Sequence, residues 1–267
     1  MTSRRGIVAP ILLGLLLASV AVTGCGTQRA DSAASSAAPS AVPTVVKPTP
    51  SADDFVASVM RTRDLATAVL DITVSTAVGD VARTLDGTGT AAIDQGFGDL
   101  EWTDAAGAVT RELSNGKGLF VQTEVPDGTW TRLPSERSTP TGRLAEPLRG
   151  LGGLADVTRA GSDDLDGTPT TRYTGTLPAS PDTLALLGFS DEELVQIGTD
   201  WQGSVVDVIV WVDGAGRVVG VERSLDLPEA GAGPVSAVTT TRLSDFTTSI
   251  DLEPPPTESV VEAPEGQ

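Results

Sequence analysis

From residue 66 onward, the chain consists largely of short segments in which apolar and polar residues alternate, and this pattern constrains the fold most. In residues 66–76, Ala68, Leu70, Ile72 and Val74 alternate with mostly polar residues. A period of two is typical of a β-strand with one buried face. The segment therefore predicts a strand with these apolar side chains pointing inward.

Similar segments follow along the chain, and turn residues separate them. Strands are predicted at residues 81–93, 98–103, 109–114, 119–124, 129–133, 157–162, 170–177, 204–212, 217–227 and 235–246. Asp-Gly and Asn-Gly pairs with short connections favour antiparallel hairpins over βαβ crossovers. Residues 205–212 are apolar on both faces, so we expect that strand to be covered on both sides.

Three parts of the chain show helical spacing. Residues 52–63 follow an acidic start and carry apolar residues at helical intervals, which predicts one amphipathic helix. Residues 143–154 are interrupted by proline and glycine and predict a short helix at best. Residues 181–197 predict a helical insert, in which Ser190 and Glu193 have capping-box spacing. The predicted class is α+β, with one large curved antiparallel sheet and helices on one face.

The start of the chain has the order of a secretory signal. Arg4 and Arg5 precede a mainly apolar run over residues 7–22, and small residues close it before Cys25, the only cysteine. Val22-Thr23-Gly24-Cys25 resembles the lipobox of bacterial lipoproteins, which implies a diacylglyceryl thioether on Cys25 and cleavage before it. The alternatives are a cleaved signal with a chance free cysteine, or an uncleaved membrane helix.

Composition divides the chain into four parts. Residues 1–24 are the predicted signal peptide, and residues 25–50 are the lipidated cysteine with a disordered tether rich in Ala, Ser and Pro. Residues 51–252 are long enough for one folded domain with its own core. Residues 253–267, which are rich in Pro and Glu, are predicted to be an acidic disordered tail.

Charge and missing residue types exclude several classes of function. The net charge is −18, and an acidic surface repels nucleic acid, so no nucleic-acid partner is expected. The chain has no histidine, which excludes Ser-His-Asp and Cys-His catalysis. We expect no cofactor and no metal, and interpret the acidic runs 163–166 and 191–193 as solvated. Two G-x-G-x-x-A patterns, at residues 87–92 and 150–155, are interpreted as a strand bulge and a broken helix.

Three stretches resemble a known family. Residues 166–178 read Asp-Gly-Thr-Pro-Thr-Thr-Arg-Tyr-Thr-Gly-Thr-Leu-Pro, residues 210–219 read Val-Trp-Val-Asp-Gly-Ala-Gly-Arg-Val-Val, and residues 244–246 read Ser-Asp-Phe. Together they resemble the LppX/LprA/LprF/LprG lipoproteins of mycobacteria and relatives, and the low lysine content also fits an actinobacterial source. The resemblance implies a fold like LolA and LolB, an unclosed half-barrel whose concave side and helices enclose an apolar cavity.

The same resemblance implies that the protein binds and carries acylated lipids or lipoglycans in the cell envelope without catalysis. The expected partners are an acylated lipid or glycolipid, the outer face of the cell membrane through the anchor on Cys25, and an envelope transporter. The candidate cavity residues are Leu70, Ile72, Val74, Leu119, Val121 and Ile209. One alternative is a non-catalytic interaction lipoprotein with a filled core, and another is a hydrolase that uses carboxylates alone.

Overall fold

The computed structural model describes residues 52–93, 95–123, 128–134, 142–228, 230–231, 233–247, 249 and 252–263. The predicted signal peptide, Cys25 and the predicted tether lie outside the described residues. Twelve strands form one sheet in the order β12-β6-β5-β4-β3-β2-β1-β11-β10-β9-β8-β7. Their bounds are β1 (Thr67–Val78), β2 (Val81–Ala92), β3 (Phe97–Asp104), β4 (Val109–Asn115), β5 (Gly118–Thr123), β6 (Trp130–Leu133), β7 (Ala155–Leu165), β8 (Thr168–Pro178), β9 (Val205–Asp213), β10 (Val218–Leu227), β11 (Val235–Thr247) and β12 (Val260–Glu262).

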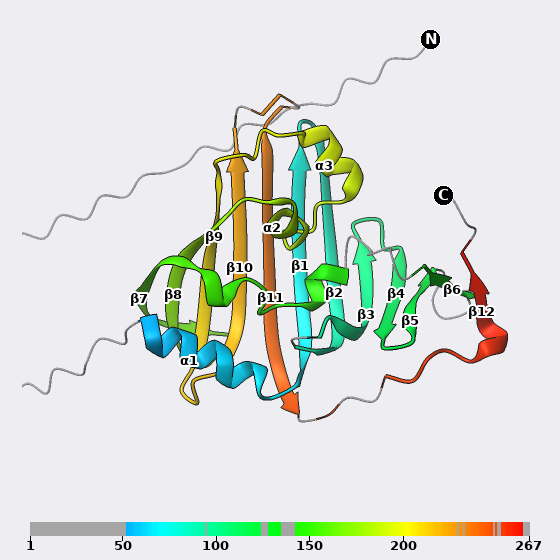
Figure 1. The fold of residues 1–267 in the computed structure, drawn as a ribbon, viewed down its shortest axis with the longest axis horizontal. Coiled ribbons are helices and arrows are strands. Elements are labelled where there is room, and N and C mark those ends of the chain that lie inside the picture. Colours follow the sequence, from blue (N-terminus) through cyan, green and yellow to red (C-terminus); the bar gives the residue numbers. More distant parts are fainter. Residues whose placement is uncertain are drawn as a thin grey trace, which may run out of the picture. The chain divides into compact units, whose positions relative to one another are not determined.

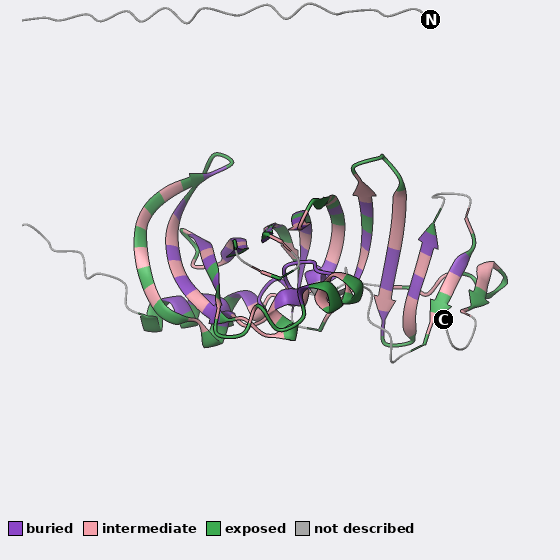
Figure 2. Cartoon of the chain, turned by 90° about the horizontal axis from the view of Figure 1, so that it is seen from above, coloured by how far each residue is buried: buried purple, intermediate pink, exposed green. Residues whose placement is uncertain are grey.

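The sheet is open, with β7 at one edge and β12 at the other. Every strand from β1 to β11 pairs with its neighbours in antiparallel register, as the hairpin pattern predicted. The exception is β12, which pairs in parallel with β6. The sheet is strongly twisted. Its central strands run vertically in Figure 1, whereas its outer strands are seen lengthwise in Figure 2, which is turned by 90°. The predicted α+β class with an open, curved sheet is confirmed.

The described helices are short. They are α1 (Ala52–Arg63), α2 (Pro181–Ala185) and α3 (Asp191–Ile197), with 3-10 turns η1 (Gly142–Ala145), η2 (Leu151–Gly153) and η3 (Thr257–Ser259). The helix predicted at residues 52–63 is confirmed, and the segment around residue 150 forms 3-10 turns. In α3, Ser190 Oγ accepts a hydrogen bond from the Glu193 backbone N–H, and the Glu193 carboxylate accepts one from the Ser190 N–H, which confirms the capping box.

All three α-helices pack on one face of the sheet, here called the inner face. In Figure 1 they lie in front of the strands from β8 to β2. We call α1, residues 142–154 and residues 180–198 together the cover. The core is the layer between the cover and the inner face, to which the cover contributes Phe55, Val59, Leu184, Leu187, Phe189 and Ile197. Figure 2 shows this buried layer in purple, with exposed residues on the outer sides of the helices and at the strand ends.

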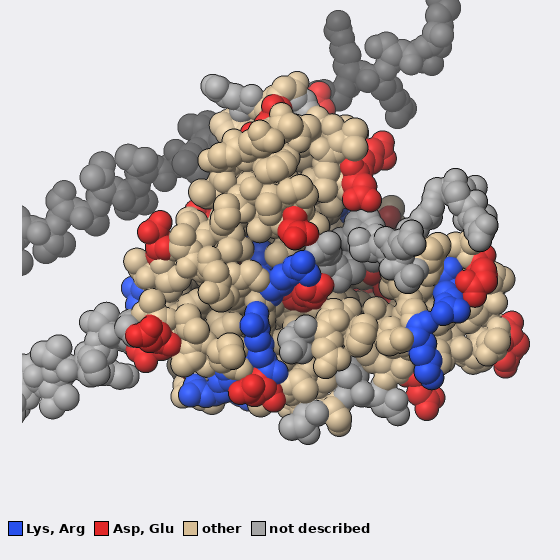
Figure 3. All heavy atoms as spheres, in the orientation of Figure 1, with Lys and Arg blue, Asp and Glu red and all other residues tan. Residues whose placement is uncertain are grey.

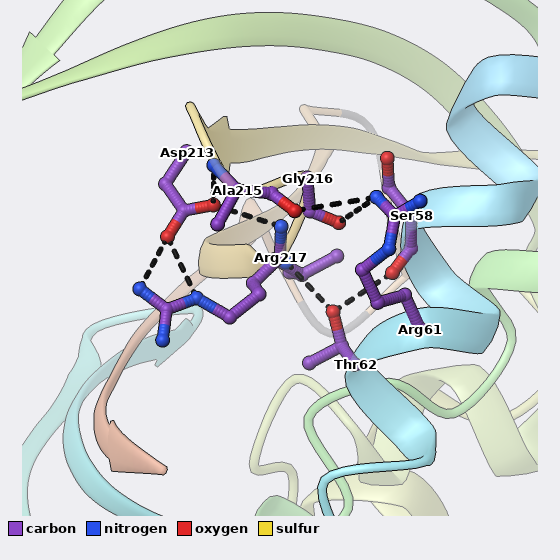
Figure 4. Close-up of polar contacts among 8 residues, drawn as sticks. Ser58, Arg61, Thr62, Asp213, Ala215, Gly216 and Arg217 are labelled. Atoms are coloured by element: carbon purple, nitrogen blue, oxygen red, sulfur yellow. Dashed lines mark hydrogen bonds and ion pairs between the residues drawn. The ribbon is translucent and has the colours of Figure 1, made fainter.

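A threonine near the end of α1 fixes this helix to the sheet. Thr62 is fully buried, and its hydroxyl donates to the Ser58 carbonyl while it accepts a hydrogen bond of 2.8 Å from the Val218 N–H. Figure 4 shows this bridge between α1 and the first residue of β10. The hydroxyl thus satisfies a backbone donor that would otherwise be buried without a partner.

The turn between β9 and β10 completes this junction. The Asp213 carboxylate accepts hydrogen bonds from the backbone N–H groups of Ala215 and Arg217 and from the Arg217 guanidinium. The Arg61 guanidinium donates to the carbonyls of Ala215 and Gly216, each at 3.3 Å (Figure 4). The Val-Asp-Gly-Ala-Gly-Arg stretch that carried part of the family resemblance therefore forms the turn against which α1 docks.

The C-terminal part of the chain is more ordered than predicted. Residues 253–267 were expected to be a disordered tail, but residues 257–262 form η3 and β12. On the face of the sheet opposite the cover, Leu252 and Val260 pack against a small cluster of Leu113, Phe120 and Trp130. Because these two residues supply apolar contacts, the segment can order despite its high Pro and Glu content.

Candidate functional site

The inner face is apolar across most of the sheet. The strand register places Leu70, Ile72 and Val74 of β1 on the same face as the buried side chains of β9, β10 and β11. These neighbours are Val206, Val208, Val210, Val221, Leu225, Leu227, Val235, Ala237 and Leu243. The inner face is therefore the surface on which the predicted apolar site would lie.

Around β1 this surface is filled. The exposed fractions of Leu70 and Ile72 are 0%, so no space of the size of a water molecule borders either side chain. Beside Ile72, the ring of Trp102 lies over Gly87 and occupies the place of a side chain there. A Cβ added to Gly188 of the cover would lie 2.6 Å from Val74 Cγ1, so cover and sheet meet closely here.

The inner face continues beyond the helices of the cover and is less buried there. Val121 pairs with Glu112, and Glu112 pairs with Leu100, so Val121 lies on the same face as Leu70. Leu119 and Leu133 lie on that face as well. All three side chains are partly exposed. In Figure 1 no described helix lies in front of β4, β5 or β6. The inner face thus has a sealed apolar region under the cover and a partly open region with apolar side chains at β5 and β6. Between them β4 presents Thr110, Glu112 and Ser114.

Ile209 does not belong to this surface. It pairs directly with Glu222 of β10 and Thr174 of β8, whereas its neighbours Val208 and Val210 point to the inner face. Because side chains alternate along a strand, Ile209 lies on the opposite face of the sheet. The sequence pattern could not assign its side, since both faces of β9 are apolar in this region.

A few polar side chains of the inner face hold the cover. The Arg83 guanidinium donates to the Gly188 carbonyl and forms a 3.1 Å ion pair with Glu193. The Thr239 hydroxyl donates to the Leu187 carbonyl at 2.9 Å. These contacts fix the α2–α3 part of the cover through a small number of defined bonds, in addition to its apolar packing.

The most unusual of these polar residues is Arg223 of β10, which is only 2% exposed. Its Nη2 donates to the Pro147 carbonyl at 2.7 Å and to the Arg149 carbonyl at 3.1 Å, and its Nε is buried without a hydrogen-bond partner. Burial lowers the pKa of Arg223 to about 10 because desolvation disfavours the charged form. The guanidinium is therefore still a cation at neutral pH.

Our interpretation of the sequence did not single out Arg223, although a signal was present. In Val221-Glu222-Arg223-Ser224-Leu225 the period of two places Arg223 on the same face as Val221 and Leu225. A charged residue on the apolar face of a buried strand is rare without a partner. The identity of the segment contacting it, residues 147–149, could not be read from the pattern.

Most acidic side chains of the described chain are at least partly exposed. Glu112 is the one acidic residue among the buried residues described, and it lies on the inner face. Within the same part of the chain, no group of three or more His, Cys, Asp or Glu side chains is placed to hold a metal ion. Glu193, from one of the acidic runs, caps α3 and pairs with Arg83.

None of the helices among the described residues has the length and hydrophobicity of a membrane span. Residues 87–92 lie within β2 in continuous register with β1 and β3, so the strand bulge predicted there is wrong. Residues 151–153 form η2, and neither glycine pattern forms the strand-to-helix turn of a nucleotide-binding motif.

The chain is similar in structure to two mycobacterial proteins. LprF from Mycobacterium bovis matches at 15% sequence identity and a TM-score of 0.49, covering 78% of this chain and 99% of LprF. The lipoprotein LppX from Mycobacterium tuberculosis matches at 16% identity and a TM-score of 0.44, covering 76% of this chain and 100% of LppX. No family model and no curated protein matches the chain.

LprF and LppX are members of the family that the three sequence stretches resemble. The likeness is one of fold. At these identities and TM-scores it identifies no ligand and no activity for this chain.

The contrast between the two regions of the inner face gives a direct prediction. We expect Ile72→Trp to lower the free energy of unfolding by ~1–3 kcal/mol or more, because the larger ring overpacks a filled region. Val121→Trp should change it by less than about 1 kcal/mol, because Val121 is partly exposed. Urea unfolding of both variants measures the difference, and equal destabilisation would contradict the assignment of a sealed and an open region.

Proposed function

We propose that this protein is a membrane-anchored lipoprotein of the extracytoplasmic face, and that its folded domain binds and carries acylated lipids without catalysing a reaction. The acyl chain enters at the partly open region around Leu119, Val121 and Leu133 and extends along the inner face beneath the cover. In this proposal residues 25–50 form a tether that lets the domain move relative to the membrane.

The observation that carries the proposal is that the buried apolar layer under the cover and the partly exposed apolar side chains of β5 and β6 lie on one face of the sheet, with the Thr110, Glu112 and Ser114 side chains of β4 between them. The partly exposed leucine and valine side chains of β5 and β6 are in register with the buried layer under the cover. An acyl chain of about 16 carbons gains more than ~10 kcal/mol on leaving water, at ~0.8 kcal/mol for each buried methylene. That gain is large enough to offset the separation of several contacts between cover and sheet.

The construction of the cover supports this proposal. Outside α1, the described cover has no helix longer than the seven residues of α3. Such short helices have little stability of their own and depend on packing against the sheet. A ligand that replaces this packing with its own acyl chain can therefore displace the cover at modest cost.

The competing function is that of an interaction lipoprotein with a permanently filled core. The full burial of Leu70 and Ile72 is the observation that favours it. The two functions differ in whether a lipid ever occupies the inner face, so lipid binding decides between them.

The first test concerns the anchor. We expect Cys25→Ser to abolish metabolic labelling with palmitate and to leave the precursor unprocessed, because Cys25 is the only cysteine of the chain. Gel mobility and labelling measure both effects, and Ser36→Ala in the predicted tether is the control. Labelling of the Cys25→Ser variant at the level of the unchanged protein would overturn the anchor.

The second test concerns the ligand. The full chain is placed on vesicles that contain a lipid with a photoreactive acyl chain, and covalent labelling is measured after illumination. We expect labelled peptides from β1, β5 and β6 and a several-fold decrease for Val121→Trp, because its ring blocks the entry region. Val238→Trp, at an exposed position of β11 on the opposite face of the sheet, is the matched control and should label normally. Absence of labelling on the inner face would favour the interaction lipoprotein.

A further inference from the structure

The Arg223 side chain has no countercharge among the residues that the structure describes. Among the described residues, ion pairs involve Arg83, Arg111, Arg132, Arg149, Arg172, Arg217 and Arg242, but not Arg223. Its direct neighbours across the strands are Thr239 and Val208, and its neighbours on the same face of β10 are Val221 and Leu225. All four are buried. The guanidinium therefore lies within the apolar layer and is bound by two backbone carbonyls only.

A buried charge of this kind is costly, and holding the cover does not require it. Charges in protein interiors are generally paired, because desolvation of an ion is expensive. On the adjacent strand Thr239 holds the Leu187 carbonyl through a neutral hydroxyl. A neutral primary amide also carries two N–H donors for the carbonyls of Pro147 and Arg149, so holding these two carbonyls does not by itself require a positive charge.

The contacts of Arg223 indicate what would complete the site. A guanidinium presents several N–H donors in a planar fork that fits the oxygens of a carboxylate or phosphate. The carbonyl oxygens of Pro147 and Arg149 occupy two of these donor directions, both from Nη2, and Nε is left unsatisfied. Both carbonyls belong to the cover, so displacement of residues 147–149 would leave the cation without its acceptors.

We propose that Arg223 binds the anionic group, a carboxylate or a phosphate, of the acylated ligand on the inner face. The inference rests on the proposed function and assigns the ligand class within it: acidic lipids are bound in preference to neutral ones. Beneath the cover, an apolar layer with a single buried cation matches an amphiphile with a long apolar part and one negative group, and the buried Glu112 of the inner face lies outside this layer, on β4.

The negative charge of the rest of the molecule opposes a preference for anionic lipids, so measuring that preference tests the proposal sharply. The chain has a net charge of −18, and Figure 3 shows acidic and basic side chains interspersed over the cover side, with uncharged areas between them. General electrostatics would therefore disfavour anionic ligands. A preference for them requires a local cation at the binding site.

The experiment compares lipids that share one photoreactive acyl chain and differ in the polar group. The full chain on neutral vesicles is offered a fatty acid, a phosphatidylglycerol, a diacylglycerol or a cationic trimethylammonium lipid. We expect at least ten-fold stronger labelling by an anionic lipid than by the diacylglycerol. Comparison of labelling by the two anionic lipids distinguishes a carboxylate ligand from a phosphate ligand.

Variants then test whether Arg223 causes the preference for anionic lipids. Arg223→Met should label equally with neutral and anionic lipids, and Arg223→Lys should retain most of the preference because it keeps the charge. Arg111→Met is the matched control, since it removes a partly exposed arginine on the opposite face of the sheet that pairs with Asp99. It should keep the preference.

A phosphatidylglycerol with the photoreactive group on its glycerol head gives a result that needs no variant. It should label peptides that contain residues 147–149 or 218–227. Labelling of the head group elsewhere, equal labelling by all four lipids, or an unchanged preference in Arg223→Met would overturn the role of Arg223. Equal labelling would leave lipid binding intact, whereas absence of labelling by every lipid would overturn the proposed function as well.

Discussion

The structure depends on the burial of one apolar face of a wide, open sheet. All neighbouring strands of the sheet pair in antiparallel fashion except β6 and β12. The inner face of this sheet is too large and too apolar to remain in water. The chain covers it with α1 and with two irregular segments inserted between strand pairs. Because these segments are short, they contribute little independent stability and their positions are set by contacts with the sheet.

Those contacts combine packing with a few defined polar bonds. Thr62 joins α1 to β10, Arg83 and Thr239 hold the carbonyls at the end of α2, and Arg223 holds residues 147–149. Each of these side chains bonds a backbone group across the interface, Thr62 from the cover and the three others from strands, so removal of one would release a specific part of the cover. In the proposed function, a ligand replaces both parts of this attachment, because its acyl chain replaces the apolar packing and its anionic group replaces the carbonyls on Arg223.

Much of the fold could be predicted from the sequence, because side-chain periodicity is a local property. The alternation around Leu70 identified β1 and its inward face, and the helical spacing around Phe55 identified α1. Tertiary pairing could not be predicted this way. Ile209 was placed on the wrong face because β9 is apolar on both sides, and the C-terminal segment was expected to be disordered although it pairs in parallel with β6.

For the site, the alternation in β5 correctly grouped Leu119 and Val121, which the register places on the same face as Leu70. It could not show that this face is sealed at β1 and partly open at β5, because that difference depends on where residues far apart in sequence pack. Arg223 illustrates the same limit, since its position on an apolar face is visible in the sequence but its acceptors come from residues 147–149.

The central claim is that an acyl chain enters between the inner face and the cover, and a reversible lock tests it most directly. A Cβ on Gly188 would lie 3.7 Å from Val74 Cβ, a separation that suits a disulfide. Because φ at Gly188 is +84°, a cysteine there is strained, and the oxidised double variant is therefore compared with its own reduced form. The measurement is the labelling of the Val74→Cys, Gly188→Cys double variant by a photoreactive acyl lipid, before and after reduction. The account predicts little labelling of the oxidised protein and recovery on reduction, whereas full labelling of the oxidised protein at the inner face would contradict it.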